Sequence, residues 1–95
     1  MGLRMQRHRS RPAGPKTAES LFGEVIREFR KRQGFSQEEL AFNSGYSTTY
    51  IGQLERGQKS PSLRTILSLA GALKTRGSDL LLRFEALSPV SRIRL

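Results

Sequence analysis

The side chains best suited to chemistry in this chain form one short polar run, and their chemistry is hydrogen bonding. Thr48, Thr49 and Gln53 carry hydroxyl and amide groups that donate and accept hydrogen bonds. Ile51 and Leu54 take the apolar positions of the same stretch, so the three polar residues lie on the outer face of a helix. Such a face could bond to the edges of DNA bases.

Sequence signals around this run predict a helix, a tight turn and a second helix. Ser36 and Glu39 have the spacing of a capping box, which starts the first helix. Gly45 stands where the chain must turn, and Ser47 can cap the second helix. Many proteins use two short helices joined by a tight turn to present one helix to the major groove of DNA.

The flanking segments have the periodicity of helices too. Apolar residues recur at helical spacing in two stripes, which are Phe22, Val25, Ile26 and Phe29, then Leu63, Ile66, Leu67, Ala70 and Leu73. Gly34 ends the helix before the motif, while Ser78 and Asp79 open a last helix that ends at Leu87. Five helices without a strand pattern predict an all-α domain over residues 17–87.

The charge of the chain favours a polyanionic partner, nucleic acid above all. Its 95 residues include 17 lysines and arginines against 8 acidic residues, which gives a formal net charge of +9. Residues 1–16 are rich in arginine and contain no acid, so we expect a disordered basic arm there. This arm either follows the DNA or is a leader without a binding role. Residues 88–95 form a short basic tail.

The residue types needed for catalysis and metal binding are scarce. The chain has no cysteine, and its one histidine, His8, lies in the arm. No nucleophile–base pairing and no glycine-rich phosphate loop is visible. We therefore expect no enzymatic activity, no metal and no cofactor. The apolar runs are far shorter than the roughly 20 residues that cross a bilayer, so we expect no membrane partner.

In order and spacing, these motifs resemble the phage-repressor and Cro-type helix-turn-helix proteins, also called the XRE family. The resemblance covers residues 22–81. It is carried by GFSQEELA at 34–41, Gly45, IGQLERG at 51–57, and the apolar positions that follow Pro61. It implies a compact five-helix domain like that of lambda repressor, with the helix-turn-helix at the second and third helices.

The resemblance also implies a role for each polar residue around the motif. The residues expected to contact base edges are Thr48, Thr49, Gln53 and Tyr50, although Tyr50 could instead pack at the protein surface. The residues expected to contact phosphate are Ser36, Gln37, Ser47, Lys59, Arg30, Arg64 and Arg56. Arg30 and Glu55 are expected to form a structural ion pair between the first helix and the end of the recognition helix.

Proteins of this type usually bind DNA as two-fold dimers, which implies an apolar surface for a second copy. The candidates are Leu69, Leu81, Leu82 and Phe84, and the alternative is that they complete the core of one subunit. The chain departs from the family pattern at residues 74–77, where KTRG replaces the usual glycine-then-aliphatic turn before the last helix.

The implied function is sequence-specific binding of double-stranded DNA by a cytoplasmic, nucleoid-associated transcriptional regulator. A repressor or autoregulator on a two-fold symmetric operator is the leading interpretation, as in phage repressors and the small controller proteins of restriction–modification systems. The alternative is an antitoxin-like protein that neutralises a protein partner and binds DNA secondarily. A third hypothesis is non-specific binding to nucleic acid or anionic membrane through the arm alone.

Overall fold

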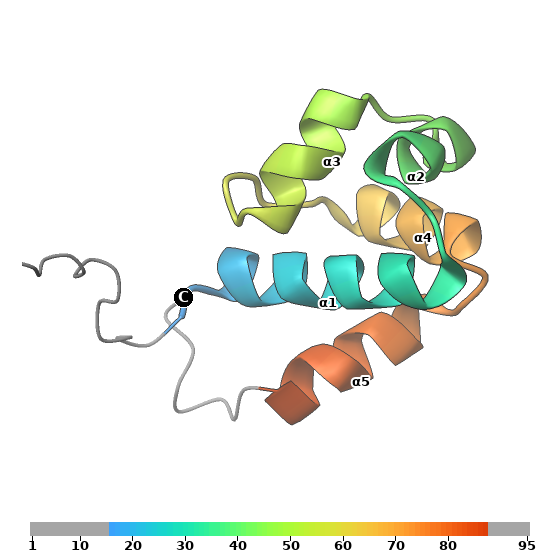
Figure 1. The fold of residues 1–95 in the computed structure, drawn as a ribbon. Helices are drawn as coiled ribbons and strands as arrows, with labels where there is room; N and C mark the ends of the chain where they lie inside the picture. The colour runs from blue at the N-terminus through green and yellow to red at the C-terminus, as the bar shows by residue number, and fades with distance from the viewer. Residues whose placement is uncertain (1–15, 88–95) are drawn as a thin grey trace, which may run out of the picture.

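Five helices follow one another in the computed structural model, which describes residues 16–87 (Figure 1). They are α1 (Ala18–Gln33), α2 (Gln37–Ser44), α3 (Thr48–Glu55), α4 (Leu63–Ala72) and α5 (Gly77–Leu87). No strand occurs among the described residues. The predicted all-α fold is therefore confirmed, with the two helices of the motif being α2 and α3.

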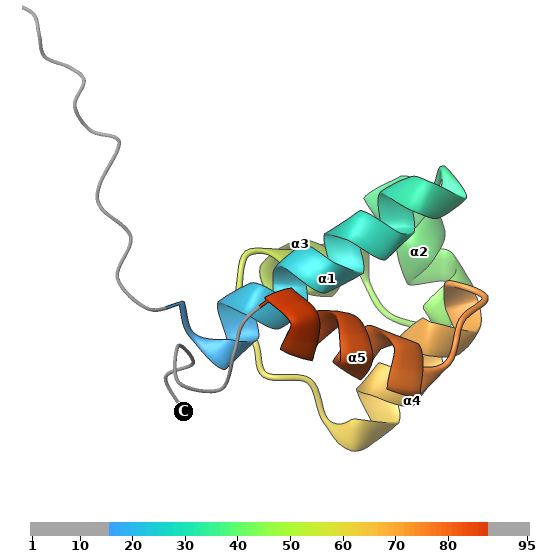
Figure 2. The ribbon, with the colours of Figure 1, turned by 90° about the horizontal axis from the view of Figure 1, so that it is seen from below.

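The five helices form a closed ring of contacts. Helix α1 contacts α3 and α5, while α2 contacts α3 and α4, and α4 also contacts α5. Seen from below, α5 lies alongside α1 and α4, on the opposite side from α3 (Figure 2). The fully buried side chains of the common core come from all five helices and are Val25, Ile26, Leu40, Ile51, Leu54, Leu69, Leu73 and Leu80.

A hydroxyl caps the start of each of the first four helices. The side chains of Thr17, Ser36, Ser47 and Ser62 each accept a hydrogen bond from the backbone N–H three residues later. In α5, Asp79 instead reaches back, and its carboxylate accepts from the backbone N–H of Arg76 at 3.1 Å. This bond starts α5 at Gly77, before the two residues predicted to open it.

The turn between α2 and α3 requires a left-handed residue, and Gly45 supplies it at φ 82°. The backbone N–H groups of Gly45 and Tyr46 both donate to the carbonyl of Ala41, at 2.9 and 3.0 Å. Ser44, the last residue of α2, donates its hydroxyl to the carbonyl of Leu40 at 2.7 Å. The end of α2 is thus closed by three hydrogen bonds, which fix the direction in which α3 leaves.

A second glycine sets the distance between α1 and α3. A Cβ atom on Gly23 would lie 2.4 Å from the carbonyl oxygen of Leu54 and 2.7 Å from that of Glu55. No side chain fits in that space, so α1 needs glycine here to approach the end of α3. This approach brings the last residue of α3 next to the side chains of α1.

Candidate nucleic-acid interface

The first turn of α3 presents two threonines to solvent. Thr48 and Thr49 are exposed, while Tyr50 and Gln53 are half-buried. Ser47, directly before them, uses its hydroxyl to accept from the N–H of Tyr50 at 3.0 Å. The polar face predicted from the sequence is therefore present on α3, with its two most accessible side chains at the N-terminal end.

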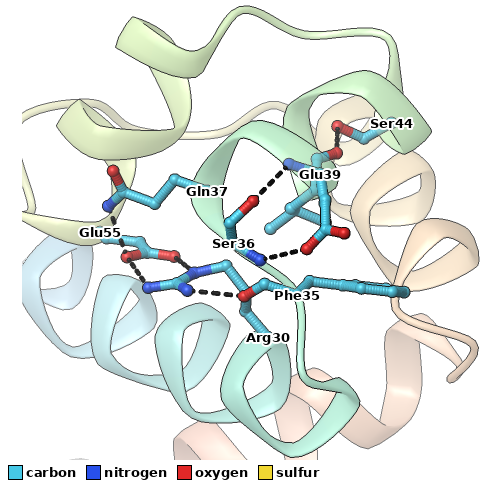
Figure 3. A network of polar contacts seen from close by, with 8 residues as sticks. Arg30, Phe35, Ser36, Gln37, Glu39, Ser44 and Glu55 are labelled. Atoms are coloured by element: carbon cyan, nitrogen blue, oxygen red, sulfur yellow. Dashed lines mark hydrogen bonds and ion pairs between the residues drawn. The ribbon is translucent and has the colours of Figure 1, made fainter.

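A buried ion pair holds the other end of α3 (Figure 3). Arg30 Nε donates to Glu55 Oε2 at 2.6 Å, and its Nη2 donates to Oε1 at 3.0 Å. The exposed fractions of these side chains are 10% and 4%. Gln37, the first residue of α2, also donates to Glu55 Oε1 at 3.0 Å. One carboxylate thus joins α1, α2 and α3.

Beside this network, the phosphate contact expected of Arg30 stays a prediction. Its remaining terminal nitrogen, Nη1, donates to the carbonyl of Phe35 at 2.8 Å, so each of the three guanidinium nitrogens donates one hydrogen bond within the fold. A guanidinium has five N–H groups, so two remain beyond these three hydrogen bonds. Arg30 belongs to the scaffold.

The start of α2 combines a capping box with free backbone donors. Ser36 Oγ accepts from the N–H of Glu39 at 3.0 Å, and the carboxylate of Glu39 accepts from the N–H of Ser36 at 2.7 Å (Figure 3). Ser36 is exposed, and Gln37 is half-buried with its amide on Glu55. A helix N-terminus of this kind attracts phosphate through its N–H groups and its partial positive charge.

Cationic side chains follow α3 in the chain. Lys59 and Arg64 are exposed on either side of the cap of α4, which is Ser62. Arg56 is exposed as well, and its guanidinium donates to Gln58 Oε1 at 3.4 Å. Along the chain, these positive charges come after the exposed threonines of α3, whereas the start of α2 comes before them.

The structure also shows a polar chain that sequence reasoning missed. Tyr46 donates its phenol to Thr65 Oγ1 at 2.9 Å, and Thr65 Oγ1 lies 3.0 Å from Ser62 Oγ. The ring of Tyr46 stacks on that of Tyr50, with centroids 5.1 Å apart and planes at 29°. Tyr46 lies in the turn before α3, so the i, i+4 rule for helical neighbours gave no signal for this pair.

The residues expected at a dimer surface differ in their exposure to solvent. Leu81 and Leu82 of α5 are 42% and 67% exposed. Leu69 is fully buried in the core of the subunit, so its assignment to a dimer surface is wrong. Phe84 is half-buried and packs edge-on against Phe22, with centroids 6.4 Å apart.

Two leucines of α4 are exposed where a helical stripe had predicted core. Leu63 and Leu67 are 71% and 56% exposed. A Cβ atom on Gly77 would lie 3.0 Å from Leu67 Cδ2, so the side chain of Leu67 reaches the start of α5. The periodicity correctly predicted that α4 is a helix with an apolar stripe. It could not show that this stripe is wider than the face of α4 that the other helices cover.

A second ion pair joins α1 to α5. Arg83 donates from Nε to Glu28 Oε1 at 2.9 Å and from Nη2 to Oε2 at 3.0 Å. Arg32, one turn along α1, donates to the same carboxylate at 3.2 Å. The hydrogen bond from Arg83 lowers the pKa of Glu28 from its ordinary value of 4.5, and the positive charges of Arg83 and Arg32 act in the same direction.

The predicted arm and tail lie outside the described residues, apart from Lys16, which forms an ion pair with Glu24. His8 lies outside them as well. Within residues 16–87, no helix is long and apolar enough to cross a membrane.

Comparison with known proteins places this fold and its site in one family. The model of the helix-turn-helix family matches residues 26–80, and the chain belongs to that family. It is similar to the control protein C.SmaI of Serratia marcescens, with 41% identity over 63 residues, which are 66% of this chain and 75% of that protein.

Solved structures agree with this assignment. The restriction–modification controller protein C.AhdI from Aeromonas hydrophila matches with a TM-score of 0.63 and 48% identity, over 64% of this chain and 92% of that chain. The controller protein C.Esp1396I, solved as a tetramer with its natural 35 base-pair operator, shares the fold with a TM-score of 0.69 at 22% identity, over 75% of this chain and 93% of that chain. The chain is a sequence-specific DNA-binding transcriptional regulator of the helix-turn-helix family.

Proposed function

We propose that this regulator binds a two-fold symmetric operator as a homodimer and acts as a repressor or autoregulator. The observation that carries the proposal is the setting of α3. Its first turn exposes Thr48 and Thr49, while its last residue, Glu55, is held by three hydrogen bonds from α1 and α2. Reading bases needs exposed polar side chains on a rigid support, and α3 has both.

The proposed roles follow from this setting. Thr48 and Thr49 contact base edges in the major groove, where a threonine methyl group packs on thymine and its hydroxyl bonds to several bases. Gln53 reaches a further base, and Tyr50 contacts a base or phosphate beside the first turn. Each good contact discriminates between bases by roughly 1–3 kcal/mol.

Phosphates on both sides of the groove position the protein on DNA. The start of α2, through Ser36 and Gln37, and the cap of α3, Ser47, hold one backbone. The residues after α3 hold the other backbone through positively charged side chains, which are Arg56, Lys59 and Arg64. Such contacts supply affinity without carrying sequence information, in keeping with a chain of net charge +9.

A second copy of the chain completes the operator-binding unit. One domain of this size reads only a few base pairs, and a two-fold dimer places two recognition helices about 34 Å apart, one turn of DNA. The exposed leucines of α5, Leu81 and Leu82, are the proposed centre of the contact. Large exposed apolar side chains near one another commonly mark such surfaces.

The names of C.SmaI and C.AhdI suggest a more specific role. We infer that this chain is a controller-type regulator, and that residues 17–87 are its DNA-binding domain. Regulation through binding alone, without catalysis, is the function that this site supports. Such a regulator works in the cytoplasm, on the nucleoid.

Selection of bound sequences from random duplex DNA tests the proposal directly. We expect enrichment of a two-fold symmetric motif by the full chain, and an at least fivefold loss of affinity for that motif in Thr48→Ala and Thr49→Ala, from about 1 kcal/mol or more for each contact. The control is Glu85→Ala, which changes an exposed residue of α5. Failure to enrich any sequence, or unchanged affinity for the enriched motif in both Thr48→Ala and Thr49→Ala, would overturn it.

A further inference from the structure

We propose that Tyr46 is a positioning residue for DNA binding, which fixes the ring of Tyr50 and ties it to the first turn of α4. This inference rests on the proposed function of Tyr50 at the DNA surface. Tyr46 itself is in the turn between α2 and α3, outside the recognition helix.

The ring of Tyr46 packs against the ring of Tyr50. The two rings are stacked, with 5.1 Å between their centroids and 29° between their planes. Both side chains are half-buried and pack against the core. A stacked aromatic pair is stabilised beyond its buried area, so the ring of Tyr46 restricts the orientations that Tyr50 can adopt.

The phenol of Tyr46 is anchored at a different element. It donates to Thr65 Oγ1 at 2.9 Å, and Thr65 is only 6% exposed. Ser62 Oγ lies 3.0 Å from the same hydroxyl and accepts from the N–H of Thr65 at 3.1 Å. The hydrogen-bond chain therefore ends at the cap of α4. Its middle member, Thr65, is buried, and a hydrogen bond shielded from water is stronger than one in water.

Tyr46 thus joins two parts of the proposed interface. On one side is the first turn of α3, which presents Thr48 and Thr49 as well as Tyr50. On the other is the start of α4, where Lys59 and Arg64 stand next to the cap Ser62. A displacement of Tyr46 would let the ring of Tyr50 move relative to the start of α4, and binding is sensitive to such preorganisation.

The chain offers an optical probe of this pair without DNA. It has two tyrosines and no tryptophan, so its near-ultraviolet tyrosine signal comes from Tyr46 and Tyr50 alone. Stacked rings couple their transitions. The near-ultraviolet circular dichroism of Tyr46→Phe and Tyr50→Phe should therefore not add up to the wild-type spectrum. Additive spectra would show that the two rings are independent and would overturn the proposal before any DNA is added.

A double-mutant cycle on DNA binding provides the functional test, with the duplex enriched by the wild-type chain as probe. We expect Tyr46→Leu to weaken binding about three- to tenfold, since it removes the stacked ring that holds Tyr50 in place. In the Tyr50→Ala background, the same change should have no further effect, because Tyr46 acts through Tyr50. Tyr46→Phe keeps the ring and should lie between Tyr46→Leu and wild type.

Val25→Ala controls for loss of stability alone, since Val25 is a buried residue of α1. If Val25→Ala and Tyr46→Leu weaken binding equally at equal loss of melting temperature, Tyr46 has no positioning role. Independent effects of Tyr46→Leu and Tyr50→Ala would also reject it. If Tyr50→Ala leaves binding unchanged, or if no duplex is enriched, the proposed DNA contact itself fails, and the inference fails with it for that reason.

Discussion

At the scale of single residues, Glu55 has more partners than any other side chain of the motif. Its carboxylate accepts two hydrogen bonds from Arg30 and one from Gln37, and it is 4% exposed. A buried ion pair need not add stability over an apolar pair of equal volume, but removal of one partner leaves a buried charge without compensation. Glu55 therefore matters for where α3 lies as well as for whether the chain folds.

Glu55→Ala should destabilise the protein by about 3–5 kcal/mol, because the guanidinium of Arg30 would stay buried and unpaired. Thermal unfolding followed by circular dichroism measures this loss, with the exposed-site variant Glu85→Ala as control. Melting of Glu55→Ala at the wild-type temperature would show that the pair contributes nothing to the fold.

At the scale of elements, the five helices begin and end at residues with recognisable physical roles, with one exception. After α4, Lys74 adopts φ 59°, a left-handed conformation that glycine usually takes. This is the departure from the family pattern noted at residues 74–77. The turn nevertheless closes, because the N–H of Thr75 donates to the carbonyl of Ala70 at 2.9 Å and Asp79 caps α5.

Lys74→Gly should stabilise the protein by about 0.5–1 kcal/mol, because glycine relieves the left-handed strain at some cost in the entropy of the unfolded chain. The change corresponds to an increase of a few degrees in melting temperature, about 4 °C per kcal/mol or more for a small domain. Lys74→Ala is the matched control, since it removes the charge and keeps the Cβ atom. Equal stability of the glycine and alanine variants would contradict the strain argument.

The Glu28–Arg83 pair predicts a pH dependence in the contact between α1 and α5. The pKa of Glu28 is lower in the folded protein than its ordinary value of 4.5, so the folded state favours the charged form. The contribution of the charged Glu28 to stability is complete above pH 4.5, and it is lost as the pH falls through the lowered pKa. The pair is partly exposed, so the contribution is below about 1 kcal/mol.

Glu28→Gln should therefore be less stable than wild type at pH 7 and equal to it at low pH. Urea unfolding at several pH values measures the difference, which should shrink in 1 M salt as the charges are screened. A difference that persists unchanged at low pH would assign the loss to packing instead of charge.

At the scale of the whole molecule, the charge is concentrated in the segment before the described fold. Residues 1–16 contain Arg4, Arg7, Arg9, Arg11 and Lys16 and no acid. The recognition helix itself contributes mostly uncharged side chains, so a large part of the affinity must come from cations elsewhere on the chain. We propose that the arginines of this segment add phosphate contacts.

Replacing the four arginines by glutamine should make the salt dependence of DNA binding shallower. Each lost phosphate contact reduces the slope of log K against log salt by about 0.9, so the decrease is up to about 3.6. Binding titrations over a range of salt concentrations measure it. An unchanged slope would mean that the segment does not touch DNA.

The local features of this protein could be predicted from its sequence, because each depends on neighbours in the chain. The capping box of Ser36 and Glu39, the left-handed Gly45 and the cap Ser47 act over three or four residues, and all three have their predicted conformations. The order and spacing of these signals also indicated the family. The polar face of α3 followed from helical periodicity alone.

Other features were decided only by tertiary packing. Leu69 and Leu67 lie two residues apart on one helix, yet the first is fully buried and the second is 56% exposed. Arg30 pairs with Glu55 only because Gly23 lets the end of α3 approach α1. Tyr46 acquires its partners from α3 and α4 in the same way. A sequence pattern shows which face of a helix is apolar, but burial and pairing depend on what the other helices bring to that face.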